Sequence, residues 1–445
     1  MNRVLREIAG YLLGFLIFII LLPCLMWWVG GKSFEASEWL WVTGGLLMAV
    51  GLTLSIWSIV HMRRVGKGNP FDAYGHEVAP RTQQLLIDGP YGFSRNPMLL
   101  GVFIYLGGIA ALLHTWQAAA VWAGFVGIML SQVRSEENRL EKDFGKEYLD
   151  YRSRVHWLLG NRSRGLSFAI VALIYLSSIG VGMLTYRWMG KMNANGVLCL
   201  LGADVVATVY VWLFGLIYKN VSIYDPYWRV APPGLLTTWL FIKGFNTPYL
   251  MLLVAVWLWG IRLTANWAYT FRGIYAEDWR YTRYRNNCRP FIFHIINFFG
   301  LNMMPTLLVF FNMLPALLLP EQHQQANILS WAALAVCLGA VAIELTADIQ
   351  RHRFVRQHPN HNEILQDGLW KHGRHPNYFG EISMWWGVWL MYVSLNGFAC
   401  RPWLIAAPIA MTALFLFISI PMMEKRQLEN TPGYAAYRQR TRILI

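Results

Sequence analysis

Long apolar runs separated by short polar or basic loops extend along most of this chain. Residues 11–30 and 329–347 are two of these runs, and each has about the twenty residues that an α-helix needs to cross a bilayer. The pattern predicts an all-α, multi-pass transmembrane helical bundle with about eleven or twelve spans. The expected spans are 11–30, 39–61, 98–114, 116–133, 166–184, 196–217, 248–265, 291–319, 328–347, 379–396 and 403–421.

Two runs and the N-terminal run need further comment. Segment 234–246 is short, so it is a re-entrant helix, an interfacial helix or half of a tight hairpin. Run 291–319 holds Pro305 and Pro315, which predict a kinked or broken helix. The first run is longer than a signal-peptide core and no cleavage site follows it, so we expect a retained span.

Composition and charge agree with a membrane protein. Only 14% of the residues are charged, against about a quarter in soluble proteins. The net charge of +14 comes from basic loops between spans, which is the positive-inside pattern rather than a nucleic-acid surface. We therefore expect a multi-pass protein of a bacterial inner membrane, with both termini in the cytoplasm and no nucleic-acid partner.

Metal and disulfide chemistry are not indicated. The five cysteines are scattered without a C-x-x-C pair. Five histidines gather in one basic region, but their spacings match no standard zinc pattern. They are His352, His358, His361, His372 and His375. We expect no metal.

One sequence pattern occurs twice. DGPYGFSRNP (88–97) precedes two expected spans and a polar tail, and DGLWKHGRHP (367–376) does the same. An alignment of the tails without a gap matches Glu136 with Glu424 and Gly145 with Gly433. We conclude that the chain consists of two homologous modules. Their expected bounds are 1–160, a four-span module, and 161–445.

The repeated pattern predicts a binding site at a helix N-terminus. In GRHPNYFGE (373–381), a proline can start a helix whose free N–H groups attract anions, and a carboxylate follows where hydrocarbon begins. A charged, adenine-bearing cofactor would suit this site, and the alternative is a basic loop that only fixes topology. The candidate residues are Arg374, His375, Asn377, Tyr378, Glu381 and Glu424, with Tyr91, Arg95, Asn96, Glu136 and Glu137 in the first module.

These motifs resemble two known families. GPYGFSRNP with its glutamate-containing tail resembles the isoprenylcysteine carboxyl methyltransferase and phospholipid methyltransferase group, and GKGNPFDAYGH (66–76) resembles a loop of its bacterial members. The second module resembles membrane reductases related to steroid 5-alpha-reductase. The matching stretches are SIYDPYWRVAP (222–232), WGIRLTANW (259–267), AEDWRYTRYR (276–285), ADIQRHRF (347–354) and 367–387.

The resemblance implies S-adenosylmethionine as a possible cofactor of the first module and NADPH as that of the second. NADPH phosphates require several arginines, and the second module adds Arg262, Asn266, Asp278 and Arg280 to the candidate cofactor-binding residues. The first module departs from its family pattern. Asn96 replaces the motif histidine, Leu99 stands where an aromatic residue is expected, and Val102 stands where the second module has a glutamate.

Reduction also requires a proton donor. Tyr224, Asp225 and Tyr227 are the catalytic candidates, although Asp225-Pro226 equally fits a plain turn. Glu344 and Asp348 are one helical turn apart, and we expect them to pair with Arg351 or with arginines of 272–285.

The sequence thus predicts an integral membrane lipid-modifying enzyme. Its C-terminal module would reduce a double bond of a lipid or isoprenoid substrate with NADPH, and its N-terminal module would be methyltransferase-like. Two alternatives stay open: methyl transfer by both modules, or a non-catalytic lipid sensor or scaffold.

Overall fold

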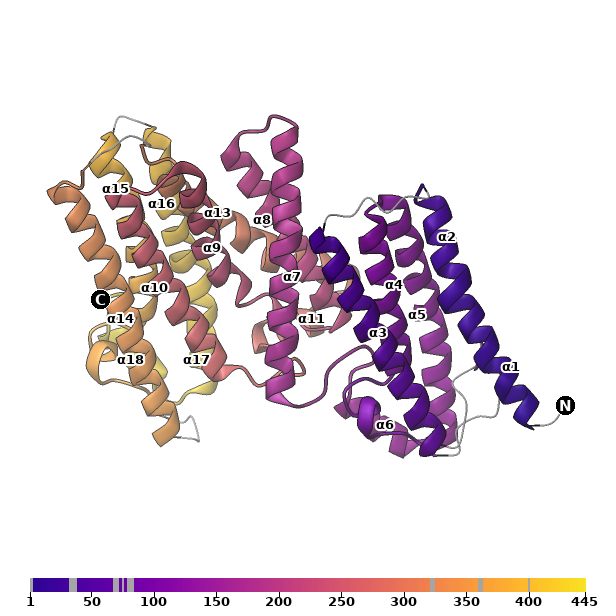
Figure 1. The fold of residues 1–445 in the computed structure, drawn as a ribbon. Helices are drawn as coiled ribbons and strands as arrows, with labels where there is room; N and C mark the ends of the chain where they lie inside the picture. Colours follow the sequence, from indigo (N-terminus) through magenta and orange to yellow (C-terminus); the bar gives the residue numbers. More distant parts are fainter. Residues whose placement is uncertain are drawn as a thin grey trace. The chain divides into compact units, whose positions relative to one another are not determined.

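The computed structural model describes residues 3–31, 38–66, 72–73, 76–77, 84–320, 325–358, 363–398 and 401–445. Helices make up most of this part of the chain, and the twelve apolar segments predicted above are all helical. Two strands of two residues each, β1 (Asp72–Ala73) and β2 (His76–Glu77), pair antiparallel. The chain divides into unit 1, Met1–Ile170, and unit 2, Val171–Ile445 (Figure 1).

Unit 1 is a helical bundle whose core lies between three of its helices and the N-terminal helix. Leu106, Leu113 and Ala118 are among its most deeply buried residues. The N-terminal helix passes through a π-helical segment, η1, before its second half begins. The elements are α1 (Arg3–Phe15), η1 (Leu16–Leu21), α2 (Leu22–Val29), α3 (Glu38–Arg64), η2 (Gly89–Gly92), α4 (Pro97–Leu113), α5 (Trp116–Phe144) and α6 (Lys146–Arg154).

Unit 2 packs its helices around Trp259, Met384 and Trp385, which are almost fully buried. Helix α7 (Arg164–Lys191) begins before the division between the units. The others are α8 (Gly196–Ile217), η3 (Val221–Ile223), α9 (Tyr227–Lys243), α10 (Thr247–Thr270), α11 (Trp279–Asn287), α12 (Pro290–Ile295), η4 (Ile296–Met303), α13 (Met304–Leu317), α14 (Ile328–Gln357), η5 (Gly368–Lys371), α15 (Pro376–Asn396), η6 (Pro402–Ile405), α16 (Ala406–Leu414), η7 (Phe415–Ser419), α17 (Ile420–Asn430) and α18 (Tyr434–Arg440).

The fold class is confirmed: the protein is a multi-pass helical membrane protein. Among the described residues, nine helical stretches are long and apolar enough to cross a bilayer. Three segments expected as spans or half-spans lie outside these nine: α4 and α9 are shorter, and α15 carries Glu381 and many Trp and Tyr residues. Segment 234–246 is half of a hairpin, because α9 turns at Gly244 and packs along α10.

The predicted interruption of 291–319 takes the form of a change in helix type. The chain stays helical from Pro290 to Leu317 but is π-helical over Ile296–Met303, and Pro305 lies in the first turn of α13. A π-helical segment re-routes hydrogen bonds without ending the helix, so one span is kept.

The sequence repeat is also a repeat of helix packing within each unit. In unit 1, a Cβ added at Gly101 of α4 would lie 2.3 Å from Ser55 Oγ of α3. In unit 2, a Cβ added at Gly380 of α15 would lie 2.3 Å from Glu344 Cγ of α14. Glycine is required at both places because the facing helices approach too closely for any side chain. Seven residues further on, Gly108 and Gly387 repeat this contact in the same register.

Candidate cofactor site

Arg374 ties the start of α15 to the C-terminal tail. Its Nε donates a hydrogen bond to Glu424 Oε1 at 2.7 Å, and its guanidinium also donates to the carbonyl oxygens of Arg438, at 2.8 Å, and Thr441. The side chain is buried, as is that of Glu424. Arg374 therefore has three structural partners and holds the end of the chain against the N-terminus of α15.

His375 completes this set of contacts, and Arg374, His375, Glu424 and Arg438 together are called the frame below. Its Nε2 lies 3.2 Å from Glu424 Oε1, and its ring stacks on Tyr378 with an interplanar angle of 4°. Burial lowers the pKa of His375 to about 4, although contact with Glu424 opposes this shift. The imidazole is therefore neutral at pH 7. Glu424 Oε2 accepts a further bond from Arg438 Nε at 3.0 Å.

Unit 1 builds the same frame from equivalent atoms. Arg95 Nε donates to Glu137 Oε1 at 2.9 Å, and its NH1 donates to the carbonyls of Arg152 and Val155 at 3.1 and 2.8 Å. A tyrosine on each terminal short helix anchors the preceding loop. Tyr151 donates to Tyr91 O at 2.7 Å in unit 1, and Tyr437 donates to Trp370 O at 2.6 Å in unit 2.

The frame corrects one detail of the sequence alignment. Glu137, rather than Glu136, occupies the position of Glu424, since Glu137 is the carboxylate that holds Arg95. The alignment without a gap kept Gly145 and Gly433 in register. The turns before α6 and α18 differ in length. An alignment that matches the two glycines therefore pairs the wrong acidic residue of unit 1 with Glu424.

Above this frame, unit 2 has a cavity of about 440 Å³, a size typical of small-molecule sites. Three arginines and several aromatic residues line it, and Glu363 is the one carboxylate among the described lining residues. The Arg426 guanidinium lies 3.9 Å from the centre of the Trp279 ring. The lining residues are Trp279, Arg351, Phe354, Val355, Glu363, Ile364, Leu365, Trp370, Arg374, His375, Asn377, Tyr378, Met423, Arg426, Gln427, Asn430, Thr431, Tyr434 and Tyr437.

Unit 1 has a smaller cavity of about 250 Å³ in the corresponding place. Its polar end is formed by Tyr91, Arg95, Asn96, Gln132 and Glu136, and the Glu136 carboxylate is 3.5 Å from Arg139 on the next turn. Burial raises the pKa of Tyr91, so its phenol stays neutral. The rest of the lining is apolar: Ile17, Phe18, Met62, Pro97, Met98, Leu99, Val102, Phe125, Ile128, Met129 and Val133.

Six of the predicted cofactor-binding residues of unit 2 lie outside the lining of its cavity: Arg262, Asn266, Asp278, Arg280, Glu381 and Glu424. Arg262 of α10 donates to Asp348 Oδ2 at 2.6 Å and also contacts Glu344. Glu381 accepts hydrogen bonds from the indoles of Trp259 and Trp385, both at 2.9 Å. Asn266 Oδ1 lies 2.6 Å from His352 Nε2.

The expected partner of Glu344 and Asp348 was wrong. Arg262 holds both carboxylates, instead of Arg351 or the arginines of 272–285. The physical reason is that α10 packs directly against α14, which brings Arg262 to the buried face of α14. Arg351 lies further along α14, where it lines the cavity.

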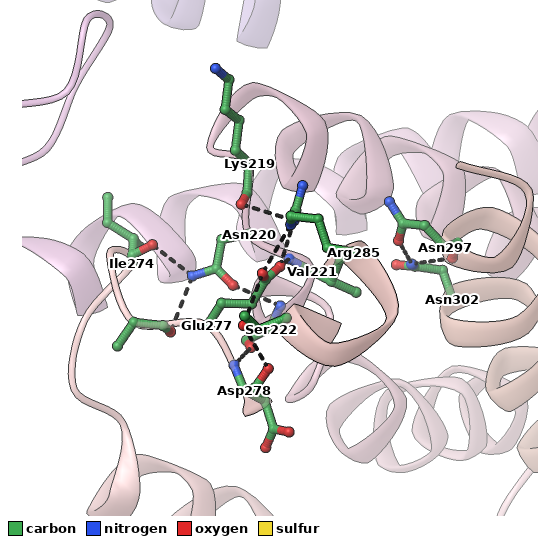
Figure 2. A network of polar contacts seen from close by, with 12 residues as sticks. Lys219, Asn220, Val221, Ser222, Ile274, Glu277, Asp278, Arg285, Asn297 and Asn302 are labelled. Carbon is green, nitrogen blue, oxygen red and sulfur yellow. Dashed lines mark hydrogen bonds and ion pairs between the residues drawn. The ribbon is translucent and has the colours of Figure 1, made fainter. Parts of the chain in front are cut away.

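A second polar network holds the two loop motifs of unit 2 together, and Figure 2 shows it. Asn220 Nδ2 donates to the carbonyl of Ile274 at 2.6 Å, and the backbone N–H of Val221 donates to Glu277 Oε1 at 2.9 Å. Glu277 also pairs with Arg285 at 2.7 Å. These bonds hold residues 220–222, where the SIYDPYW motif begins, against residues 274–278, where the AEDWRYTRYR motif begins. The two motifs are far apart in sequence.

Asp278 and Arg280 belong to this second motif. Asp278 caps α11 by accepting from the backbone N–H of Arg280 at 2.9 Å, and it also accepts from Arg280 Nε at 2.8 Å. Neither residue lines the described cavity, but their neighbour Trp279 does.

The three catalytic candidates point to different partners. Tyr224 OH lies 2.6 Å from Thr306 Oγ1, whereas Asp225 accepts from Tyr281 OH. Tyr227 OH donates to Asp204 Oδ1 at 2.8 Å. Tyr224 and Asp225 therefore do not form the pair that their adjacency suggested.

The Tyr227–Asp204 pair borders a cavity of about 10 Å³, which is room for one water molecule. Sequence reasoning missed Asp204, and the available signal was a single carboxylate in the apolar run 196–217. It also missed Arg426 as a lining residue. The loop GKGNPFDAYGH lies mostly outside the described residues.

Comparisons with known proteins agree with the two resemblances. A family model for phospholipid methyltransferase matches residues 39–147, which lie within unit 1. The uncharacterized protein C594.04c of Schizosaccharomyces pombe is 25% identical over 264 residues, covering 53% of this chain and 74% of its own length. No solved structure matches the chain.

A second family model, described as "Protein of unknown function (DUF1295)", matches residues 211–441. This region covers most of unit 2 and is the part that resembles the steroid-reductase-related membrane proteins. Because the match extends over more than half of the chain, the protein belongs to the DUF1295 family.

Proposed function

We propose that the protein is a membrane lipid-modifying enzyme in which unit 2 binds NADPH and reduces a double bond of a lipid or isoprenoid, while unit 1 binds S-adenosylmethionine. One observation carries the proposal. The same arginine–glutamate frame supports a cavity in each unit, but two arginines without an ion-pair partner among the described residues line the unit 2 cavity, whereas the unit 1 cavity is mostly apolar with one further carboxyl group, that of Glu136.

In unit 2 the remaining charges are mostly positive, with two arginines and the carboxylate of Glu363 in the described lining. Arg374 is neutralised by Glu424, whereas Arg351 and Arg426 have no ion-pair partner among the described residues. Guanidinium groups are suited to bind the oxygens of a phosphate or pyrophosphate. Trp279 and Tyr378 offer ring faces on which an adenine can stack. Phosphate groups with an attached aromatic base therefore match this lining.

In unit 1 the charged residue of the described lining besides Arg95 is an acid, Glu136. Glu137 neutralises Arg95, and Glu136 at the cavity lies 3.5 Å from Arg139, one turn further along the helix. Leu99 occupies the position that Tyr378 has in unit 2, so the cavity is less polar. A carboxylate in an apolar pocket suits a cation such as a sulfonium, and it disfavours several phosphates.

The long apolar helices around both cavities suit a substrate that enters from the bilayer. We place the cavities on the cytoplasmic side, in line with the charge distribution of the loops. Reduction adds a hydride to one carbon of the double bond and a proton to the other. Tyr227, held by Asp204, and Tyr224 remain our candidates for orienting the substrate or supplying that proton.

Thermal-shift titration of the detergent-purified protein tests the proposal. NADPH should raise the melting temperature of the wild type, and this shift should be lost in Arg351→Gln. Arg353→Gln is the matched control, because Arg353 is exposed on the same helix and does not line the cavity. S-adenosylmethionine should give a shift that Glu136→Gln removes.

Each other outcome selects an alternative. A shift with S-adenosylmethionine alone, lost in Arg351→Gln, would indicate methyl transfer in unit 2. If neither cofactor changes the melting temperature of a protein that melts cooperatively, the result would favour the sensor or scaffold function.

A further inference from the structure

A buried cluster in unit 2 holds three carboxyl groups around Arg262, which is the one base buried with them among the described residues. Arg262 faces three carboxyl groups, those of Glu344, Asp348 and Glu381, and all four residues are at least nine-tenths buried. Two uncompensated negative charges in such a place would be very costly. The cluster must therefore gain positive charge or lose negative charge at neutral pH.

The packing of the helices does not require these acids. Unit 1 repeats the contact between the two helices with Ser55 at the position of Glu344 and Val102 at that of Glu381. The α3–α4 pair therefore forms without any carboxyl at either place. A purely structural role for the surplus acid in α14 and α15 is thus disfavoured by the protein's own second copy of the fold.

The hydrogen bonds indicate which two groups share the missing charge. Asp348 has its own bond from Arg262 NH1, whereas Glu344 and Glu381 both reach the same Arg262 NH2 group. Glu344 packs on Gly380, directly beside Glu381, and the two carboxyls are in contact. As two carboxylates they have no donor between them, and apart from its ion pair with Arg262 NH2 the Glu344 carboxyl has no hydrogen-bond partner among the described residues.

We propose that Glu344 and Glu381 share one proton at neutral pH, so that unit 2 carries a buried carboxylic acid. One proton supplies the missing donor and removes one negative charge. Two close carboxylates sharing a site commonly hold a proton in this way. The indole N–H groups of Trp259 and Trp385 donate to the Glu381 oxygens and stabilise the negative charge that the pair keeps.

The acid lies close to the cavity. Glu381 follows the lining residue Tyr378 by three positions on α15, a rise of about 4.5 Å. Glu344 precedes the lining residue Arg351 by seven positions on α14, a rise of about 10 Å. The pair is therefore about one to two turns beyond the inner end of the cavity.

This position gives the proton a role that rests on the proposed function. If unit 2 binds a reduced nicotinamide as proposed above, that cofactor would supply the hydride to one carbon of the double bond. The O–H bond of the pair, instead of that of Tyr224 or Tyr227, would then break to supply the proton to the other carbon. Two carboxylates are costly in this buried place, so the pair would stay deprotonated only briefly. It then takes up a proton from water, past Asp348 one turn further along α14.

Infrared spectroscopy tests the shared proton without any substrate. In the wild type at pH 7, the C=O stretch of a protonated carboxyl should appear and shift in deuterated water. Glu344→Gln should lose intensity equal to one carboxyl for each chain, and Glu381→Gln should lose the same. Unchanged spectra in both variants would overturn the proposal.

Stability gives a second, independent reading. Glutamine imitates a neutral carboxyl, so Glu344→Gln should melt close to the wild type, whereas Asp348→Asn should melt several degrees lower because Asp348 is the ionised partner of Arg262. Equal losses in the two variants would mean that Glu344 is ionised. If Glu344→Gln fails to fold, this too contradicts a neutral Glu344.

The two proposals can fail separately. Loss of NADPH stabilisation in an otherwise intact protein, with the infrared band present, would leave the shared proton and remove the reductase. An absent band in a protein that binds NADPH would remove only the shared proton.

Discussion

Arg374 is a residue of the repeated motif whose substitution should act mainly on stability. In Arg374→Gln, the shorter neutral side chain cannot reach Glu424 and the two carbonyl oxygens of the C-terminal tail together. Glu424 then stays buried with His375, which is neutral, and with Arg438, which is half-exposed. The change therefore loosens the end of the chain as well as the cavity wall.

The size of the effect follows from these contacts. Breaking a buried ion pair by removing one partner costs about 3–5 kcal/mol. Because Arg438 still offsets part of the Glu424 charge, we expect the lower end, about 3 kcal/mol. At about 2–4 °C for each kcal/mol in a unit of this size, the melting temperature should fall by roughly 6–12 °C.

Thermal unfolding in detergent, followed by tryptophan fluorescence, measures this loss. Arg95→Gln should cause a similar loss, since Arg95 makes the equivalent bonds in unit 1. Arg440→Gln is the control, because Arg440 is an exposed arginine of α18 outside the frame. If Arg374→Gln melts at the same temperature as the wild type yet no longer binds NADPH, Arg374 contacts the cofactor and does not act mainly on stability.

Three further predictions follow from single contacts. Gly380→Ala should destabilise unit 2 by about 1–3 kcal/mol in the melting assay, because the added methyl group clashes with α14. Gly339→Ala is the control: its Cβ would meet no atom within 4 Å, so this variant should be neutral or stabilised by up to about 1 kcal/mol. Equal effects of the two changes would contradict the close packing of α14 and α15. The pKa of His375 in the folded protein is lowered to about 4, so the unfolded chain takes up a proton there more readily than the folded protein does. Stability should therefore fall by about 3 kcal/mol as the pH drops from about 6.5 to 4. His375→Gln should flatten the dependence of the melting temperature on pH over that range. Tyr437→Phe should cost about 1 kcal/mol by removing the bond to Trp370 O, and a wild-type melting temperature would show that this bond contributes nothing.

Much of the fold could be predicted from sequence because hydrophobic length decides it. The run 196–217 becomes α8 with the same limits, since a continuous apolar segment with no break has one way to satisfy its backbone in a bilayer. The sequence shows that α15 is less apolar than a typical span, but it could not predict that this helix packs in the centre of unit 2. That outcome depends on which helices surround it.

The candidate site was only partly predictable. Arg374 and His375 could be found because a repeated local motif places them beside a helix start. Arg262 could not be assigned to Glu344, because the pairing depends on the packing of α10 against α14. The choice of Glu137 over Glu136 likewise depends on which carboxylate faces Arg95, and adjacent residues on a helix point in different directions.

The central claim is that the unit 2 cavity binds the phosphates of NADPH through arginines not neutralised by the frame. Its most direct test is an equilibrium titration of NADPH, followed by nicotinamide fluorescence, with wild type, Arg351→Gln and Arg353→Gln. A charge-assisted bond contributes about 1.5–3 kcal/mol, so Arg351→Gln should weaken binding by about tenfold to a hundredfold, and Arg353→Gln should bind as the wild type does. Equal affinities for all three proteins, or no binding to any of them, would contradict the account.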